Sequence, residues 1–273
     1  MSKIWFITGS SRGLGRAITE AALRAGDRVV ATARTPRQLD ELVAEYGDAI
    51  YPLQLDVTDN LQVLQAVEAA VAHFGRLDVV VNNAGYGDLA SVEDVTLEDF
   101  SAQIDTNFYG VVHVSKAVVP ILRAQGRGHI FQVSSLGGRI GMAGLAAYQS
   151  AKWAVGGFST VLAQEVNPLG VQVTVLEPGG MRTDWSGSSM TIAPISAPYQ
   201  QSVGALVELL NSPGILPTGP ERVAEIVLEL ALREDAPLRL LIGSDAVQYA
   251  ARAAADLAVS DEKWHDLSVS ASD

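Results

Sequence analysis

Tyr148 and Lys152 are the two residues whose types and spacing most directly suggest chemistry in this chain. They lie four positions apart in a segment of helical period, so both side chains should project from one face of a helix. A phenol with an ordinary pKa of about 10 is a poor acid–base group at neutral pH, but a nearby ammonium favours the phenolate and lowers that pKa. The pair could therefore exchange a proton near neutral pH. Such a pair also arises by chance on helix surfaces, so its neighbours must decide between the two interpretations.

Short polar motifs follow two of the apolar segments that look like strands. Ser134-Ser135 come directly after a segment that ends at Val133, and Asn82-Asn83-Ala84-Gly85 come directly after Val81. In an open parallel sheet, ligands bind at the edge where the strands end. Both motifs could equally be ordinary turns, because Ser, Asn and Gly are common turn formers.

Asn107 is a polar residue inside a predicted helix that spans positions 97–123. Asn is unfavourable in a helix interior because its side chain competes for backbone hydrogen bonds. We therefore expect Asn107 either to face solvent or to be kept for a purpose.

A glycine-rich turn follows the first predicted strand and opens the first predicted helix. Its sequence is Thr8-Gly9-Ser10-Ser11-Arg12-Gly13-Leu14-Gly15. Glycines at these places let the backbone turn sharply and approach a pyrophosphate, whose charge free N–H groups and the helix dipole then hold. The alternative is an ordinary tight turn between a strand and a helix, but the position after a strand and before a helix favours a dinucleotide site.

The end of the second predicted strand discriminates between two forms of the dinucleotide. An acidic residue about 20 positions past the glycines holds the ribose 2′-hydroxyl in NAD-binding folds. Here the strand ends with Ala33 and Arg34, so no carboxylate is present and a guanidinium can pair with a 2′-phosphate. Arg12 could approach the same phosphate from the glycine-rich turn. The two arginines favour NADP(H) over NAD(H); the alternative is that both are solvated surface charges.

Two carboxylates lie close to the end of the third predicted strand. Asp56, which precedes Val57, could accept a hydrogen bond from the adenine amino group or cap the next helix. Capping fits Asp59 better, because Asp59 directly precedes the helical pattern.

The apolar segments predict an α/β fold with a doubly wound parallel sheet. Short β-branched runs, typical of strands that are covered on both faces, alternate with segments of helical period. The predicted strands are 4–7, 28–33, 50–55, 79–81, 129–133, 171–176 and 239–241. The predicted helices are 13–25, 38–46, 60–74, 97–123, 148–167 and 221–233. No linker divides the chain, so we expect one Rossmann-like domain over residues 1–273.

Two segments interrupt this alternation. Residues 184–220 contain five prolines among scattered apolar side chains such as Trp185, Met190 and Tyr199, and they predict a long excursion over the sheet. Loops of this kind are usually either substrate lids or disordered. Residues 259–273 are polar, and we expect them to be ordered only in part.

Composition excludes several functional classes. The chain has no cysteine, which excludes disulfides, thiolate metal sites and cysteine nucleophiles, and we expect no metal site. The formal net charge of −12 argues against binding to nucleic acid or to anionic membranes, which require basic patches. The N-terminal residues show neither a signal-peptide pattern nor a membrane-spanning run, so we expect a cytoplasmic protein.

Taken together, these motifs resemble the short-chain dehydrogenase/reductase family over about Ile4 to Thr183. The matching motifs are Thr8-Gly9-x-x-x-Gly13-x-Gly15, Asn82-Asn83-Ala84-Gly85, Asn107, Ser135, Tyr148-x-x-x-Lys152 and Pro178-Gly179. The resemblance implies a catalytic tetrad of Asn107, Ser135, Tyr148 and Lys152. Ser135 is preferred to Ser134 because the family's serine usually lies thirteen positions before the tyrosine. Gln149-Ser150-Ala151 departs from the more common family pattern and leaves the key pair intact.

The resemblance and the chemistry above together predict the cofactor site and the function. The residues expected to bind NADP(H) are Gly9, Ser11, Arg12, Gly13, Leu14, Gly15, Arg34, Asp56, Val57, Asn83, Ala84, Gly85, Tyr148, Lys152, Pro178, Gly179, Met181 and Thr183. The residues expected to line the substrate pocket are Tyr86, Met142 and Trp185. The expected reaction is hydride transfer between the nicotinamide and a carbonyl or secondary alcohol of a largely apolar small molecule, in a homodimer or homotetramer.

Two other functions share parts of this pattern. A catalytically silent dinucleotide sensor of the same fold should have lost Tyr148 or Lys152, and both are present. An epimerase or dehydratase acting on nucleotide-linked sugars would usually have a different first glycine spacing and a larger C-terminal domain. The reductase or alcohol dehydrogenase interpretation is therefore preferred.

Overall fold

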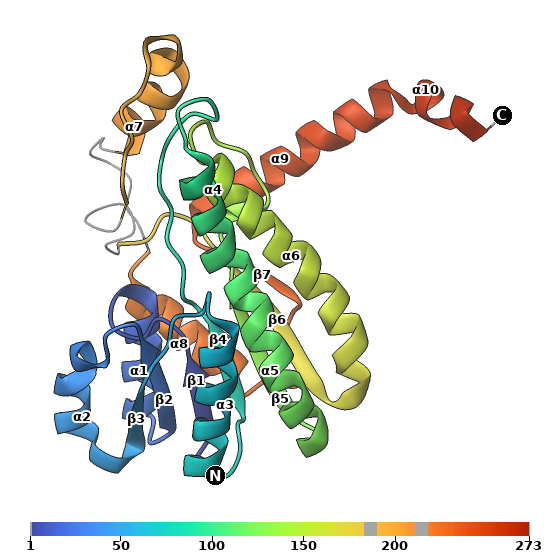
Figure 1. Cartoon of the computed structure of the whole chain (residues 1–273). Helices are drawn as coiled ribbons and strands as arrows, with labels where there is room; N and C mark the ends of the chain where they lie inside the picture. The colour runs from blue at the N-terminus through green and yellow to red at the C-terminus, as the bar shows by residue number, and fades with distance from the viewer. Residues whose placement is uncertain (1, 183–189, 211–217, 273) are drawn as a thin grey trace.

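Seven parallel strands form a single sheet in the computed structural model, which describes residues 2–182, 190–210 and 218–272. The strand order is β3-β2-β1-β4-β5-β6-β7 (Figure 1). The strands are β1 (Ile4–Ile7), β2 (Arg28–Ala33), β3 (Ile50–Gln54), β4 (Val79–Asn82), β5 (Gly128–Val133), β6 (Val171–Pro178) and β7 (Arg239–Ile242). The predicted parallel, doubly wound sheet is confirmed, and each predicted strand agrees with an observed one to within two residues at either end.

Helices cover both faces of the sheet, which explains why consecutive strand residues are apolar. The longer helices are α1 (Gly13–Arg24), α2 (Asp40–Tyr46), α3 (Asn60–Phe74), α4 (Leu97–Ile104), α5 (Gly110–Gln125), α6 (Ala146–Val166), α7 (Ala205–Leu210), α8 (Pro220–Leu230), α9 (Ser244–Lys263) and α10 (His265–Val269). The short turns are η1 (Pro36–Leu39), η2 (Gly47–Ala49), η3 (Asp105–Tyr109), η4 (Leu136–Gly138), η5 (Asn167–Leu169), η7 (Ala197–Tyr199), η8 (Gln200–Gly204) and η9 (Ser270–Ser272).

Two apolar cores lie on opposite faces of the sheet. On one face, α1 and α8 pack against Trp5 and Ile7 of β1; on the other, α3, α5 and α6 pack against Ile4 and Phe6 of the same strand. All four β1 side chains are almost fully buried. The central strand is thus enclosed on both faces, and its carboxyl end leads directly into the glycine-rich turn.

The predicted helix at 97–123 is interrupted at the position of Asn107. The chain forms α4, then a π-turn over Asp105–Tyr109 (η3), and then α5. A π-turn inserts one residue into the helical register, and such insertions frequently occur at functional sites. The prediction of one regular helix was wrong in this detail, because hydrophobic periodicity does not show a single-residue insertion.

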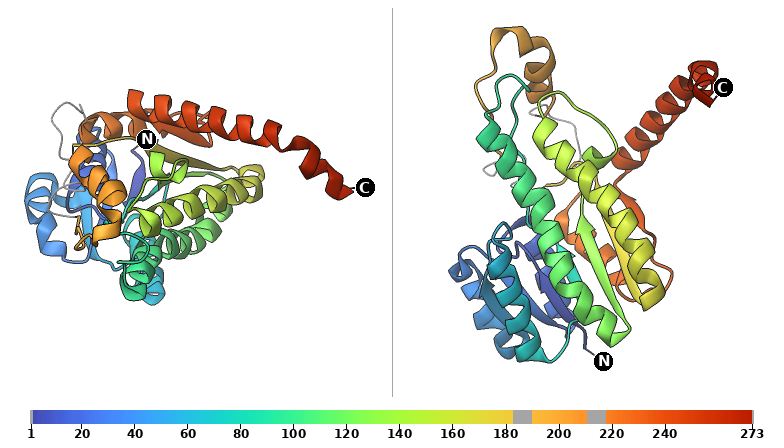
Figure 2. Two further views of the ribbon diagram at one scale, coloured as in Figure 1. Left: turned by 90° about the horizontal axis from the view of Figure 1, so that it is seen from above. Right: turned by 45° about the vertical axis from the view of Figure 1, so that its right-hand side comes forward.

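Residues 244–272 are almost entirely helical, although none of the predicted helices includes them. That residues 259–273 are ordered only in part stays a prediction. Helix α9 starts against the body and then projects away from it, followed by α10, as both views in Figure 2 show. Nearly all residues from 251 to 272 are exposed. The many alanines of α9 favour a helix by intrinsic propensity, and apolar periodicity does not reveal such a helix. No helix in the described part of the chain is long and apolar enough to cross a membrane.

Asp59 caps α3, as predicted. Its Oδ1 accepts hydrogen bonds from the backbone N–H groups of Leu61 at 2.9 Å and Gln62 at 3.1 Å. Asp59→Ala should lower the free energy of unfolding by about 1 kcal/mol, because two backbone donors lose their partner. Urea denaturation of this variant, beside Asp48→Ala at an exposed position outside the helices α1 to α10, measures the effect. Equal stability of the two variants would contradict the cap.

Candidate active site

The loops after β1 and β4 are hydrogen-bonded to one another at the carboxyl edge of the sheet. The Thr8 hydroxyl accepts from the backbone N–H groups of Asn83 at 2.9 Å and Ala84 at 3.0 Å. The Asn83 side-chain amide donates to the carbonyl oxygens of Thr8 at 2.9 Å and Gly9 at 3.2 Å. The Asn-Ala-Gly motif therefore does more than form a turn: it fixes the shape of the glycine-rich loop.

The glycine-rich turn has the geometry of a pyrophosphate cradle. Gly9 has a positive φ of 69°, which other residues rarely adopt. A Cβ at Gly15 would lie 2.2 Å from the Gly9 carbonyl oxygen, so only glycine lets α1 approach the turn this closely. Arg12 occupies the N-cap of α1 without a side-chain capping bond, and no acidic residue lies in the first turn. The N–H groups at this helix end fit an anionic group.

Both arginines predicted to bind the 2′-phosphate are exposed near this turn. Arg12 and Arg34 form no ion pair or hydrogen bond through their side chains with the described residues. Ala33 is buried and offers no acceptor for ribose hydroxyls. The two guanidinium groups therefore fit the 2′-phosphate of an NADP-type nucleotide.

Asp56 and Val57 lie after β3, on the adenine side of the predicted site. Asp56 Oδ1 accepts from the Thr58 N–H at 3.0 Å and from its hydroxyl at 2.7 Å, so part of this carboxylate serves a local turn. Val57 is buried against Gly110 at the start of α5. Asp56 keeps a second oxygen that could accept a hydrogen bond from adenine.

Ser135, Tyr148 and Lys152 come together where β5 ends and α6 begins. The buried Tyr148 phenol is hydrogen-bonded to Ser135. The Lys152 ammonium lies 5.5 Å from the centre of the Tyr148 ring and donates to the Val133 carbonyl oxygen at 2.8 Å. Tyr148 and Lys152 lie on one face of α6, as their four-residue spacing predicted. This face points into the protein, toward the end of β5.

The two neighbouring serines have different partners. Ser134 donates its hydroxyl to the Lys152 carbonyl oxygen at 3.1 Å, so it fastens α6 to β5. Ser135 accepts from the Gly137 N–H at 3.0 Å and is the serine that bonds to Tyr148. The geometry agrees with the preference for Ser135 that the sequence spacing suggested.

Burial controls the protonation of this pair in the cofactor-free protein. Desolvation raises the pKa of Tyr148 to about 12, and the Ser135 hydrogen bond opposes this rise only in part. Desolvation likewise lowers the pKa of Lys152 to about 8. The expectation that Lys152 depresses the tyrosine pKa was wrong for this state, because burial outweighs the ammonium, which is engaged by a backbone carbonyl. Tyr148 is therefore a neutral phenol, and hence a proton donor, at neutral pH.

Asn107 is fully buried in the π-turn and does not face solvent. Its Nδ2 donates to the carbonyl oxygens of Tyr86 at 2.8 Å and Gln103 at 2.9 Å. Its Oδ1 has no hydrogen-bond partner within the described residues. A Cβ at Gly85 would lie 2.5 Å from this oxygen and 3.5 Å from Lys152 Nζ, so both polar groups converge there. This buried acceptor fits a water that links the two.

The loop after β6 is held by a residue that the sequence did not reveal. Pro178 ends the strand, and the Gly180 N–H donates to Asp245 Oδ2 in the first turn of α9 at 2.8 Å. Met181 forms a backbone bridge to Thr218. Thr183, predicted to bind NADP(H), lies outside the described residues. Asp245 lies 65 positions from Gly180 and belongs to no motif, so no sequence pattern connected the two.

The predicted substrate residues lie in different surroundings. Tyr86 follows Gly85 and is half-buried; desolvation raises the pKa of its phenol. Met142 packs against an apolar cluster formed by Leu89, Leu145, Val203 and Leu206. Trp185 lies outside the described residues.

Part of the predicted lid docks on the loop after β4. The Leu89 N–H donates to the Thr191 carbonyl oxygen at 2.9 Å, and the Ala193 N–H returns a bond to Leu89 at 3.0 Å. Met190 and Tyr199 pack on the same apolar cluster as Met142. These contacts place apolar lid residues near the loop that carries Gly85 and Tyr86.

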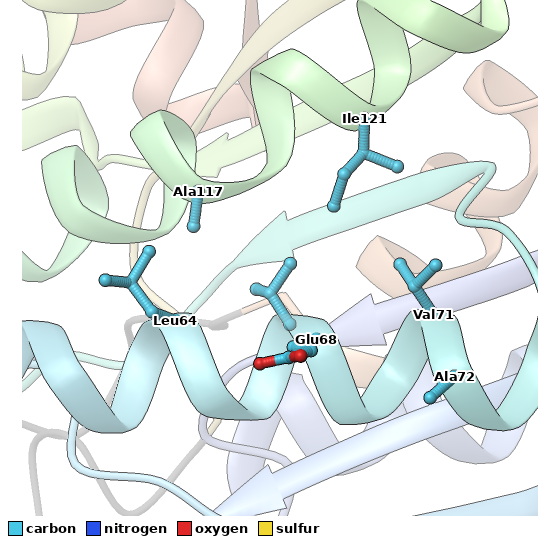
Figure 3. A pocket seen from close by; sticks show the side chains of 7 residues that line it. Leu64, Glu68, Val71, Ala72, Ala117 and Ile121 are labelled. Atoms are coloured by element: carbon cyan, nitrogen blue, oxygen red, sulfur yellow. The ribbon is translucent and has the colours of Figure 1, made fainter.

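Two hollows lie on the helical surface. A groove of about 450 Å³ between α3 and α5 is lined mainly by aliphatic side chains, including Leu64, Val71 and Ile121, and contains none of the candidate site residues (Figure 3). A second hollow of about 650 Å³ lies against the first turns of α6 and is lined by Met142, Gln149 and Trp153, among others. Only the second adjoins the loop that leads from Ser135 to Tyr148.

Comparison with known proteins agrees with this geometry. A family model described as short chain dehydrogenase matches residues 3–191. The oxidoreductase BOA17 of Botryotinia fuckeliana is 62% identical over 271 residues, which cover 98% of this chain and 99% of that protein. The 3-ketodihydrosphingosine reductase of Bacteroides thetaiotaomicron is 32% identical and covers 88% of each chain. The crystal structure of a short-chain dehydrogenase from Streptomyces avermitilis has a TM-score of 0.92 at 34% identity, covering 98% of this chain and 97% of that one.

The sheet and the groups at its carboxyl edge are those of an α/β oxidoreductase. The chain belongs to the short-chain dehydrogenase/reductase family, as the sequence motifs predicted. Solved structures with this fold include complexes with NAD and with NADP, so the family alone does not choose between the two dinucleotides.

The high pKa of Tyr148 can be measured without a substrate. Tyrosinate absorbance is recorded after rapid pH jumps of the cofactor-free parent and of Tyr148→Phe. The difference between the two titration curves should show a step centred at about pH 12. The same difference for Tyr249→Phe, which removes an exposed phenol, calibrates the amplitude of one tyrosine. A Tyr148 step centred below about pH 9 would show that the ammonium outweighs burial.

Proposed function

We propose that this chain is an NADP(H)-dependent enzyme that transfers a hydride between the nicotinamide and a carbonyl or secondary alcohol of a largely apolar small molecule. The proposal rests on the buried Tyr148 phenol, which is hydrogen-bonded to Ser135 and whose ring centre lies 5.5 Å from the Lys152 ammonium. The bound dinucleotide supplies the hydride. The protein must therefore supply a proton, a site for the carbonyl oxygen and the correct orientation.

Tyr148 donates its proton to the carbonyl oxygen in the reduction direction. This oxygen gains negative charge during the reaction, and the Ser135 hydroxyl donates a hydrogen bond to it at that moment. Ser135 has an electrostatic and positional role and forms no covalent bond to the substrate. In the reverse direction the same phenolic oxygen accepts the proton of the alcohol.

Lys152 and Asn107 support the proton transfer by Tyr148. The Lys152 ammonium stabilises the phenolate that forms when Tyr148 gives up its proton, and its N–H groups can also hold the ribose hydroxyls beside the nicotinamide. Lys152 can then give up a proton toward the phenolate, and a water held by the Asn107 Oδ1 relays a replacement proton from solvent to the neutral amine. These groups restore the protonated phenol for the next turnover.

The dinucleotide is proposed to lie along the carboxyl edge of the sheet. The glycine-rich turn, with Ser11, Gly13 and Leu14, holds the pyrophosphate, while Arg12 and Arg34 pair with the 2′-phosphate. Asp56 and Val57 contact the adenine, and the loops at 83–85 and 178–183 enclose the nicotinamide half. The free guanidinium groups support NADP(H) over NAD(H).

We infer that residues 184–220 close over a largely apolar substrate beside Tyr86, Met142 and Trp185. The apolar cluster that joins Met190 and Tyr199 to Met142 supports this role. We also propose a homodimer or homotetramer, which the exposed Tyr109 and Trp153 on η3 and α6 support.

Tyr148→Phe should abolish turnover while NADPH binding is kept, because the substitution removes the proton and leaves the ring in place. The parent is first screened against ketones and alcohols by the absorbance of reduced nicotinamide, and NADPH binding is measured by fluorescence titration. Residual activity above about one hundredth of the parent would contradict the acid–base role. A parent that binds NADPH and reduces none of a broad set of carbonyls would instead support the sensor interpretation.

Arg34→Asp should move cofactor preference from NADPH toward NADH, because a carboxylate repels the 2′-phosphate and can bind the ribose hydroxyls. We expect the ratio of kcat/KM for NADPH over NADH to fall at least about a hundredfold, the effect of losing one charge-assisted pair and adding a like charge. Arg252→Asp, the same charge change at an exposed position of α9, is the control. An unchanged ratio in Arg34→Asp would remove the argument for NADP(H).

A further inference from the structure

Glu177 is a completely buried carboxylate at the penultimate position of strand β6, directly before Pro178. Its Oε2 accepts a hydrogen bond from Arg139 Nε at 2.7 Å and lies 2.6 Å from Arg139 Nη2 in the ion pair. Its Oε1 accepts from Arg239 Nε at 2.9 Å and Nη2 at 2.5 Å. A buried carboxylate is costly unless it is fully paired, so this geometry strongly restricts all three side chains.

The three side chains come from different parts of the candidate site. Arg139 follows η4 and lies four residues after Ser135, whereas Glu177 precedes the Pro178-Gly179 loop. Arg239 begins β7, and its Nη2 packs against α6, because a Cβ at Gly156 would lie 2.7 Å from it. Gly156 lies one helical turn after Lys152. One carboxylate thus joins the serine turn, the nicotinamide-side loop and the helix of Tyr148 and Lys152.

The turn that carries Ser135 is closed mainly by bonds within itself. The Gly138 N–H donates to the Ser135 carbonyl oxygen at 2.9 Å, and the Arg139 N–H donates to that of Leu136 at 2.8 Å. These bonds fix the shape of the turn but do not set its distance from the loop after β6. The backbone ladder of β5 and β6 ends just before the turn, where the Ser134 N–H donates to the Leu176 carbonyl oxygen at 2.9 Å. Beyond that bond, the paired Arg139 and Glu177 side chains connect the turn to the end of β6.

We propose that Arg139, Glu177 and Arg239 form a positioning network that fixes the Ser135 turn relative to the Gly179–Gly180 loop. The proposal rests on the proposed function, in which Ser135 must meet the carbonyl oxygen while the nicotinamide lies beside the second loop. None of the three residues contacts the reacting atoms. They act indirectly, by fixing the distance between the Ser135 turn and the loop that follows Glu177.

Removing the charge of Glu177 should loosen both loops. In Glu177→Gln, one carboxylate oxygen becomes an NH₂ donor that faces a guanidinium donor, and the two arginines repel each other without a shared anion. In Arg139→Met, Glu177 stays paired with Arg239, so the serine turn alone should loosen. Arg139→Lys keeps the charge but replaces the planar guanidinium, which contacts Glu177 through two nitrogens, with a single ammonium, so it should hold the turn in part.

Amide hydrogen exchange of the cofactor-free protein tests the network without requiring activity. We expect Glu177→Gln to speed exchange at Gly138 and Arg139 and at Gly179 and Gly180 by about tenfold or more, with α3 unchanged. Glu225→Gln, which breaks the exposed ion pair with Arg222, is the matched control and should leave both loops unchanged. Equal exchange in the two variants, or uniform acceleration along the whole chain, would overturn the proposal. If Glu177→Gln does not fold, Arg139→Met decides by the same comparison over residues 136–140.

Kinetics with a carbonyl substrate from the screen test the consequence for catalysis. We expect Glu177→Gln and Arg139→Met to lower kcat by about ten- to a hundredfold, the effect of misplacing a catalytic group by about 1 Å. The dissociation constant for NADPH should change much less, since other loops hold the phosphates, and Arg139→Lys should recover part of kcat. Unchanged kcat despite faster exchange would overturn the positioning role. A parent without any carbonyl reduction would instead refute the proposed function, while the exchange data still decide whether the network holds the loops.

Discussion

The burial of the Lys152 ammonium is the constraint on which the rest of the site depends. Within the described residues this group has no carboxylate partner, and it donates to the carbonyl oxygen at the end of β5. A buried cation held by a backbone dipole must stay close to that dipole, so α6 can take only one position along the strand. Ser134 completes this link from the opposite direction by bonding to the Lys152 carbonyl oxygen. Tyr148, one turn earlier on α6, is thereby brought to Ser135.

Desolvation gives this arrangement its chemistry. Tyr148 stays protonated because its phenolate would be buried, whereas Lys152 is poised at a pKa of about 8 because its ammonium is buried too. A proton can therefore leave the phenol only when new negative charge is balanced by the ammonium and by the substrate oxygen. The Asn107 Oδ1, which is buried and has no donor among the described residues, adds a polar atom near the lysine, beside Gly85. The site combines a neutral proton donor with an amine that can lose and regain a proton near neutral pH.

The sequence was sufficient to predict the sheet, because strands buried on both faces are continuous apolar runs. It also identified Tyr148, Lys152, Ser135 and the glycine-rich turn, whose residue types and local spacing carry the signal. Contacts between distant positions could not be predicted: Asp245 meets Gly180 and Glu177 meets Arg139 only after the chain has folded. Glu177 was nevertheless visible in the sequence as a charged residue at the end of an otherwise apolar predicted strand. The π-turn at Asn107 and the helical C-terminus were missed because hydrophobic periodicity records neither a one-residue insertion nor alanine propensity.

The proposed chemistry requires that a phenol and an ammonium one helical turn apart face the reactive ring of a bound dinucleotide. A crystal structure of the protein with NADP⁺ would show whether they do. We expect the nicotinamide C4 within about 4 Å of the position where a carbonyl carbon would lie when its oxygen contacts Tyr148 and Ser135. The 2′-phosphate should lie beside Arg34. A nicotinamide ring bound out of reach of both Tyr148 and Lys152 would leave the proposed hydride transfer without a site.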